Sequence, residues 1–203
     1  MKPEISIILP TLNEEKNIGI LLPKIQHILK DYTYEVIVVD DSSTDKTRHI
    51  AEEFFAINNN GFVLYRGALS GLSSAIYDGF NIASGNFLIV MDADLQHDEA
   101  ILPEIINKIA TGKYDICIAS RNIENGGYGN LILTRKLLSK FGIWLANFIL
   151  NMKLSDPMSG YFGLSRKLFE EIKHSINPRG FKLLLEILYK SKNVNIAHIP
   201  YNF

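Results

Sequence analysis

Short apolar runs alternate with segments of helical periodicity over about the first 120 residues. The runs are rich in Val, Ile, Leu and Phe and carry no charge, which is typical of strands buried on both faces. They predict five strands, at 5–9, 36–39, 62–65, 87–91 and 116–119. Between these strands, apolar residues recur at spacings of three and four, as on one buried face of a helix. The pattern predicts a doubly wound α/β domain, with a mostly parallel sheet and helices on both faces.

Two of the predicted helices have recognisable starts. Ser43 or Thr44 is expected to cap the helix whose apolar face includes Ala51 and Phe55. Pro103 lies near the start of a later helix, where its missing N–H costs no hydrogen bond. Both features support the alternation of strands and helices.

The regular alternation ends after residue 121. A glycine-rich loop at 125–129 precedes a helical stretch over about 134–150, which is basic at its start and very apolar later. Two interpretations stay open for this stretch: an ordinary core helix, or a helix with one face at a membrane interface. A length of 203 residues is enough for one domain with a sizeable core, so we expect a single domain over 1–203.

Composition and charge describe an ordinary folded protein, with 47% hydrophobic and 21% charged residues. The formal net charge of -1 gives no overall field that would attract nucleic acid, and no nucleic-acid partner is expected. The single cysteine, Cys117, excludes an intrachain disulfide and favours a cytoplasmic setting with a buried thiol. The longest apolar stretch, 141–150, is shorter than the ~20 residues that cross a bilayer, so we expect a soluble or peripheral chain.

Polar and charged residues follow each of the five predicted strands. Ligands of open α/β sheets bind outside the carboxyl ends of the strands, so these positions are candidates for a binding site. They are Thr11, Asn13 and Glu14 after the first strand, Asp40 and Asp41 after the second, Arg66 after the third, Asp92 and Asp94 after the fourth, and Ser120 and Arg121 after the fifth.

The most specific of these signals is the pair Asp92 and Asp94. Residues i and i+2 of an extended segment project to the same side, and two like charges held together call for a cation between them. Mg²⁺ or Mn²⁺ suits such a pair, with substrate phosphates and water completing its coordination. For Asp40 or Asp41, capping of the following helix remains an alternative to ligand binding. His97 follows the pair directly. It can belong to the site, or it can be a solvated histidine at the surface, and both interpretations stay open.

A second signal is the glycine pair Gly71 and Gly79. Gly71 can open a helix whose free N–H groups face an anion, although both glycines can also serve close packing alone.

The motifs together resemble the family 2 glycosyltransferases of GT-A fold, and within them the polyprenyl-phosphate sugar transferases, which include the dolichol-phosphate mannosyltransferases. The resemblance covers essentially the whole chain in the expected order. Its motifs are P-T-L-N-E at 10–14, V-D-D-S-S-T-D at 39–45, G-L-S-S-A at 71–75, M-D-A-D-L-Q-H at 91–97, S-R at 120–121 and S-D-P-M-S-G-Y-F at 155–162.

The resemblance implies a role for each matched residue. Asp94 and Arg121 are expected to be catalytic, with Arg121 near the transferring sugar. We expect the acceptor phosphate to be steadied by Arg121 together with Arg135 or Lys136. The metal ligands are expected to be Asp92, Asp94 and Gln96, and the nucleotide-sugar contacts Pro10, Thr11, Asn13, Glu14, Asp40, Asp41, Asp92 and Ala93.

The implied reaction moves a hexose, mannose from GDP-mannose, to a polyprenyl or dolichyl phosphate at the cytoplasmic face of a membrane, with inversion and with Mg²⁺ or Mn²⁺. A phosphate acceptor is already ionised near neutral pH and needs no general base. Residues 1–121 would form the nucleotide-sugar half and 122–203 the acceptor half. Relatives continue past the segment matching 199–203 into an R-x-x-G-x-S-K run, so the acceptor half is expected to be truncated.

Three alternatives remain. One is a glucosyltransferase that uses UDP-glucose, and another is a catalytically silent module that binds nucleotide sugars. The third is a phosphatase of the haloacid dehalogenase type. It is disfavoured because such phosphatases place their paired aspartates after the first strand and require Thr or Val at the position of Gln96.

Overall fold

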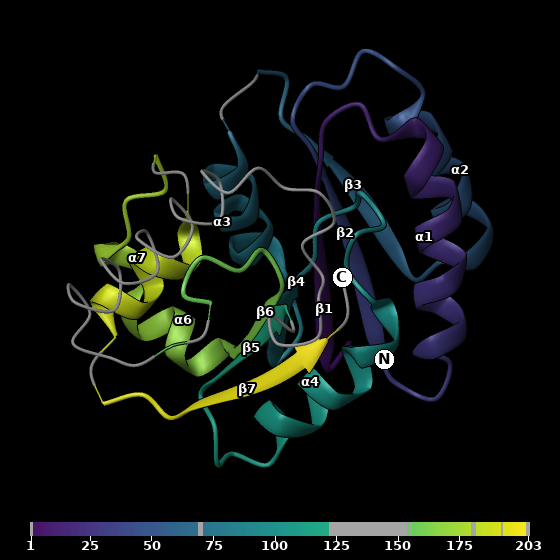
Figure 1. The fold of residues 1–203 in the computed structure, drawn as a ribbon. Coiled ribbons are helices and arrows are strands. Elements are labelled where there is room, and N and C mark those ends of the chain that lie inside the picture. The colour runs from purple at the N-terminus through teal and green to yellow at the C-terminus, as the bar shows by residue number, and fades with distance from the viewer. Residues whose placement is uncertain are drawn as a thin grey trace, which may run out of the picture.

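The computed structural model describes residues 2–68, 71–121, 154, 156–179, 182–191 and 193–201. Within these ranges the chain forms a seven-stranded sheet with the order β3-β2-β1-β4-β6-β5-β7 (Figure 1). Five strands lie where continuous apolar runs predicted them: β1 (Ile5–Thr11), β2 (Tyr34–Asp40), β3 (Gly61–Tyr65), β4 (Phe87–Val90) and β5 (Ile116–Arg121). Strands β1 to β4 run parallel, as expected.

Two further strands come from the second half of the chain and were not predicted. Strand β6 (Phe162–Ser165) lies between β4 and β5 and is antiparallel to both. Strand β7 (Ile196–Tyr201) pairs parallel with β5. Residues after 160 therefore complete the sheet that the first half begins.

Helices cover both faces of the sheet. On one face, α1 (Glu15–Ile28), α2 (Thr47–Asn58) and α4 (Leu102–Ala110) contribute to one apolar core. On the other face, α3 (Leu72–Ile82), α6 (Arg166–Ile172) and α7 (Leu183–Lys190) enclose a second core. Figure 1 shows α1 and α2 on one side of the strands and α3, α6 and α7 on the opposite side. This arrangement confirms the doubly wound α/β fold.

The two expected helix starts and the helix expected after residue 121 had different outcomes. Pro103 lies in the first turn of α4, as expected, next to the short helix η1 (Glu99–Ile101). The expected cap of α2 by Ser43 or Thr44 is wrong, because α2 begins at Thr47 and Asp45 accepts a hydrogen bond from the Thr47 N–H at 2.9 Å. The helix expected over 134–150 lies outside the described residues.

Cys117 is buried near the start of β5, as expected from its apolar neighbours. Burial raises the pKa of its thiol to about 12, so the group stays protonated near neutral pH. None of the helices within the described ranges is both long and apolar enough to cross a membrane.

Candidate active site

A pocket of about 300 Å³ opens at the carboxyl ends of β1, β2 and β4 and the start of α3. This is the edge where an open α/β sheet binds ligands, and the size is at the lower end for small-molecule sites. We call it the strand-end pocket. It is lined by Pro10, Thr11, Leu12, Glu14, Asp41, Gly71, Leu72, Ala75, Asp92, Ala93 and Asp94.

Two of the residues expected to contact the nucleotide sugar do not line this pocket. Asn13 instead joins two loops: its backbone N–H donates to the Ser43 hydroxyl at 2.9 Å, and its side-chain carbonyl accepts from the Thr44 N–H at 2.9 Å. These contacts explain why Ser43 and Thr44 do not cap α2. Asp40 is fully buried, and its Oδ1 accepts from the Ser43 N–H at 2.9 Å. Both residues hold the loops that carry their pocket-lining neighbours.

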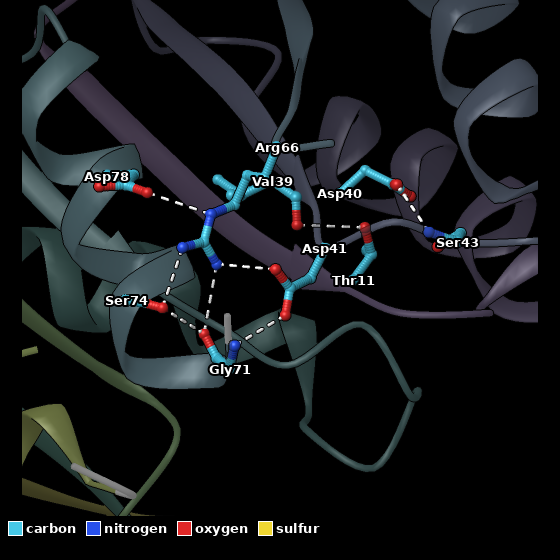
Figure 2. Close-up of polar contacts among 9 residues, drawn as sticks. All are labelled: Thr11, Val39, Asp40, Asp41, Ser43, Arg66, Gly71, Ser74 and Asp78. Atoms are coloured by element: carbon cyan, nitrogen blue, oxygen red, sulfur yellow. Dashed lines mark hydrogen bonds and ion pairs between the residues drawn. The ribbon is translucent and has the colours of Figure 1, made fainter. Parts of the chain in front are cut away.

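Asp41 lines the pocket and is also the centre of a polar network (Figure 2). Its Oδ1 accepts a hydrogen bond from Nη1 of Arg66 at 2.8 Å, and its Oδ2 accepts from the Gly71 N–H at 2.9 Å. The same guanidinium donates to the Ser74 hydroxyl at 2.9 Å and pairs with Asp78 at 3.0 Å. These contacts tie the end of β2 to the start of α3, not to α2, so the network fixes one wall of the pocket.

The two glycines of α3 have different roles. Gly71 precedes the helix with a φ of 93°, a left-handed conformation that favours glycine, and a Cβ there would meet nothing within 4 Å. Gly79 packs against the sheet so closely that a Cβ would lie 2.8 Å from Ile8 and 3.0 Å from Val39. Close packing is therefore the role of Gly79, while Gly71 shapes the turn at the pocket.

Asp92 and Asp94 both line the pocket, as the same-side argument predicted. The chain turns directly after them, since Leu95 has a φ of 61° and Asp94 Oδ1 accepts from the Gln96 N–H at 3.0 Å. Gln96 itself is exposed and is not among the residues that line the pocket. Among the described residues, no group of three or more His, Cys, Asp or Glu side chains could hold a metal ion. Any cation here would be held by two carboxylates together with ligands of other kinds.

His97 is buried, contrary to the surface position considered from the sequence. Its Nε2 lies 3.2 Å from Asp92 Oδ2, and its Nδ1 lies 2.7 Å from the Tyr201 hydroxyl. Its ring also packs against Tyr161, whose pKa burial raises well above the ordinary tyrosine value. These contacts make His97 and Tyr201 part of the site, and sequence reasoning missed both roles.

The acceptor side of the expected site stays a prediction. Arg121 ends strand β5, but its side chain is not among those that the structure describes. Arg135 and Lys136 lie outside the described residues altogether.

A model of the family described as glycosyl transferase family 2 matches residues 6–173. The chain belongs to this family. The family 2 chain is 39% identical over 202 residues to a dolichol-phosphate mannosyltransferase of Pyrococcus furiosus. This match covers 98% of the chain and 56% of that relative. It is 33% identical over 218 residues to the dolichol-phosphate mannosyltransferase of Saccharomyces cerevisiae, covering all of the chain and 78% of the relative. The chain thus spans little more than half of the Pyrococcus protein.

Solved structures of other glycosyltransferases share the fold. A glucosyl-3-phosphoglycerate synthase from Mycobacterium tuberculosis, in complex with Mn²⁺, UDP-glucose and phosphoglyceric acid, matches with a TM-score of 0.64 and 23% identity over 98% of the chain and 69% of that structure. The mannosyl-3-phosphoglycerate synthase from Rubrobacter xylanophilus matches with a TM-score of 0.66 and 18% identity, over 98% of the chain and 66% of that structure. These likenesses confirm the GT-A fold of this family 2 glycosyltransferase.

Proposed function

We propose that this glycosyltransferase transfers mannose from GDP-mannose to a dolichyl or other polyprenyl phosphate, with inversion and with help from a divalent metal. Three relatives that carry the name dolichol-phosphate mannosyltransferase support the reaction, at 31% to 39% identity over nearly the whole chain. The observation that carries the proposal is the strand-end pocket. It combines the paired carboxylates Asp92 and Asp94 with the polar ends of β1 and β2 in one cavity.

The paired carboxylates fit Mg²⁺ or Mn²⁺. Such ions typically take one or two protein carboxylates and complete their coordination with substrate phosphates and water. Asp92 and Asp94 would hold the ion, and Gln96 is the proposed third ligand. A structural relative was solved with Mn²⁺ and UDP-glucose, which supports a metal-assisted reaction of this type. When bound, the ion would neutralise negative charge on the diphosphate that leaves.

The rest of the pocket would hold the nucleoside part of the donor. Pro10, Thr11 and Glu14 contribute the end of β1, and Asp41 contributes the end of β2. Asp41 can bind a ribose or base while it contacts Arg66, because each carboxylate oxygen accepts more than one hydrogen bond.

The acceptor would arrive as a phosphate that is already ionised, so the reaction needs no general base. We assign Arg121, Arg135 and Lys136 to this phosphate on their charge, and Arg121 also on the family resemblance. A membrane-bound acceptor would bring the enzyme to the membrane surface, and the cytoplasmic face is the proposed side.

The first experiment replaces one metal-binding carboxylate. Asp94→Ala should abolish the Mn²⁺-dependent part of GDP binding in calorimetric titration, because a carboxylate at a strand end supports the ligand and not the core. The matched control is Asp31→Ala, which removes an exposed carboxylate outside the pocket and should leave binding unchanged. An Asp94→Ala variant that folds and binds GDP with undiminished Mn²⁺ dependence would remove the metal assignment.

The second arm separates a transferase from a binding module. Radiolabelled GDP-mannose, dolichyl phosphate and Mn²⁺ are incubated with the protein, and labelled lipid is measured after extraction. The proposal expects weak labelling of the lipid by the unaltered protein and none by Asp94→Ala. Tight, metal-dependent GDP binding without any sugar transfer would favour the silent binding module.

A further inference from the structure

His97 connects the pocket to the strand furthest along the chain. Its two ring nitrogens contact Asp92 Oδ2 at 3.2 Å and the Tyr201 hydroxyl at 2.7 Å. An ionised carboxylate can only accept hydrogen bonds, so Nε2 must carry the proton that it donates to Asp92. In the neutral imidazole, Nδ1 is then the acceptor for the Tyr201 hydroxyl. Both polar ends of the ring are engaged, and its orientation is set.

Three aromatic rings enclose this contact. The His97 ring centroid lies 5.1 Å from that of Tyr161 and 5.8 Å from that of Tyr201, and the two tyrosine rings lie 5.9 Å apart. Tyr161 is fully buried, and its hydroxyl donates to the carbonyl of Asp98 at 3.3 Å. The imidazole is therefore fixed by packing as well as by its two polar contacts.

Asp92 is confined on a second side by Gly160. A Cβ built on Gly160 would overlap Asp92 Oδ2, the same oxygen that faces His97. Oδ1 of Asp92, by contrast, receives no hydrogen bond from any residue that the structure describes. The two oxygens thus have different surroundings, and Oδ1 is the one left for a cation.

We propose that His97 is a positioning residue, which holds Asp92 Oδ2 so that Oδ1 is presented to the divalent cation of the donor diphosphate. Tyr201, at the end of β7, fixes the imidazole through its hydroxyl. This inference rests on the proposed function, in which Asp92 is a metal ligand. Groups that hydrogen-bond to a metal ligand orient it in advance, and their loss typically costs roughly 10–100-fold in metal affinity.

The decisive comparison uses two amide substitutions of His97. The amide of glutamine can occupy the place of Nε2 and donate to Asp92, whereas the amide of asparagine reaches only the place of Nδ1, next to Tyr201. Both remove the ring, so the loss of packing is shared between them. With GDP present, His97→Asn should weaken Mn²⁺ binding by about 10-fold or more. His97→Gln should stay within about threefold of the unaltered protein, well below that range.

Mn²⁺ affinity is measured by calorimetry and by the electron paramagnetic resonance signal of the free ion, and folding is checked by thermal unfolding. Tyr201→Phe removes one oxygen atom and tests the second contact with little risk to the fold; Mn²⁺ affinity should fall by a smaller factor. Its matched control is Tyr77→Phe, which removes a hydroxyl that donates to the Lys173 carbonyl at 3.1 Å, away from the pocket residues. This control should bind Mn²⁺ unchanged.

Equal Mn²⁺ affinities for His97→Asn, His97→Gln and the unaltered protein would overturn the inference and leave the proposed function intact. Equally large losses in the two variants would also overturn it, because ring packing and not the hydrogen bond to Asp92 would then matter. If neither variant folds, an unchanged affinity in Tyr201→Phe overturns it. Failure of the unaltered protein to bind Mn²⁺ with GDP would overturn both proposals together.

Discussion

Asp41 serves the fold and the pocket with the same carboxylate. The sequence placed it at a strand end and so predicted a ligand contact, because the carboxyl ends of parallel strands meet at one edge. The pocket-lining positions of Thr11, Asp92 and Asp94 were predictable for the same reason. The contact between His97 and Tyr201 was not predictable, since 104 residues separate the two and no periodic pattern links them.

The first residue-scale prediction concerns the Asp41–Arg66 ion pair, whose side chains are only 7% and 9% exposed. Asp41→Asn should lower the free energy of unfolding by about 1.5–3 kcal/mol, because a neutral amide leaves the buried guanidinium with one charged partner fewer. It should also weaken GDP binding. The measurement is urea denaturation of the free protein.

The control for this prediction is Asp78→Asn, which removes the other carboxylate from the same guanidinium. Asp78 is 46% exposed, so the cost should stay below about 1 kcal/mol. Equal losses of unfolding free energy in the two variants would show that burial does not make the Asp41–Arg66 pair more stabilising than the exposed Asp78–Arg66 pair.

At the scale of elements, continuous apolar runs predicted strands correctly, whereas runs of mixed polarity did not reveal the strands that they form. Strands β1, β2, β4 and β5 lie inside the sheet and β3 lies at its edge, and each of the five contains an uncharged apolar run that the sequence shows directly. Strand β6 has only four residues, which include Gly163 and Ser165, and such a run carries little signal. Strand β7 alternates buried and exposed side chains, with His198 and Pro200 on the exposed positions, so it lacks the continuous apolar run of a central strand.

The element-scale prediction tests the packing of α3 on the sheet. Gly79→Ala should destabilise the protein by about 1–3 kcal/mol, although alanine favours helix, because its Cβ would press on Ile8 and Val39. The control is Asn81→Ala on the exposed side of the same helix, which should be nearly neutral or slightly stabilising. Thermal unfolding of both variants gives the comparison, and a stabilised Gly79→Ala would contradict the close-packing role.

At the scale of the whole molecule, the rise in unfolding temperature with each nucleotide sugar shows which donor the pocket binds best. A ligand that binds the folded state at 100 times its Kd adds about 2.7 kcal/mol of stability. For a chain of this size, that gain corresponds to a rise in Tm of roughly 5–10 °C.

The donor prediction is that GDP-mannose with Mn²⁺ raises Tm more than UDP-glucose with Mn²⁺ does. A chelator should cancel most of the rise, because the diphosphate contact depends on the ion. The measurement is a thermal-shift series over nucleotide sugars at one concentration. A larger shift with UDP-glucose would replace the proposed donor and leave the proposed metal-assisted site in place.

The position of β6 has a consequence for how the protein is made. Strand β4 pairs with β1 and β6, and β5 pairs with β6 and β7, so β4 and β5 share no ladder of their own. During synthesis from the N-terminus, β5 therefore emerges before the strand that joins it to the sheet. Until β6 follows, the apolar strand β4 presents an unpaired edge of the kind that recruits other chains. The interval between translation of β5 and of β6 is thus one in which the nascent chain exposes an open strand edge to aggregation.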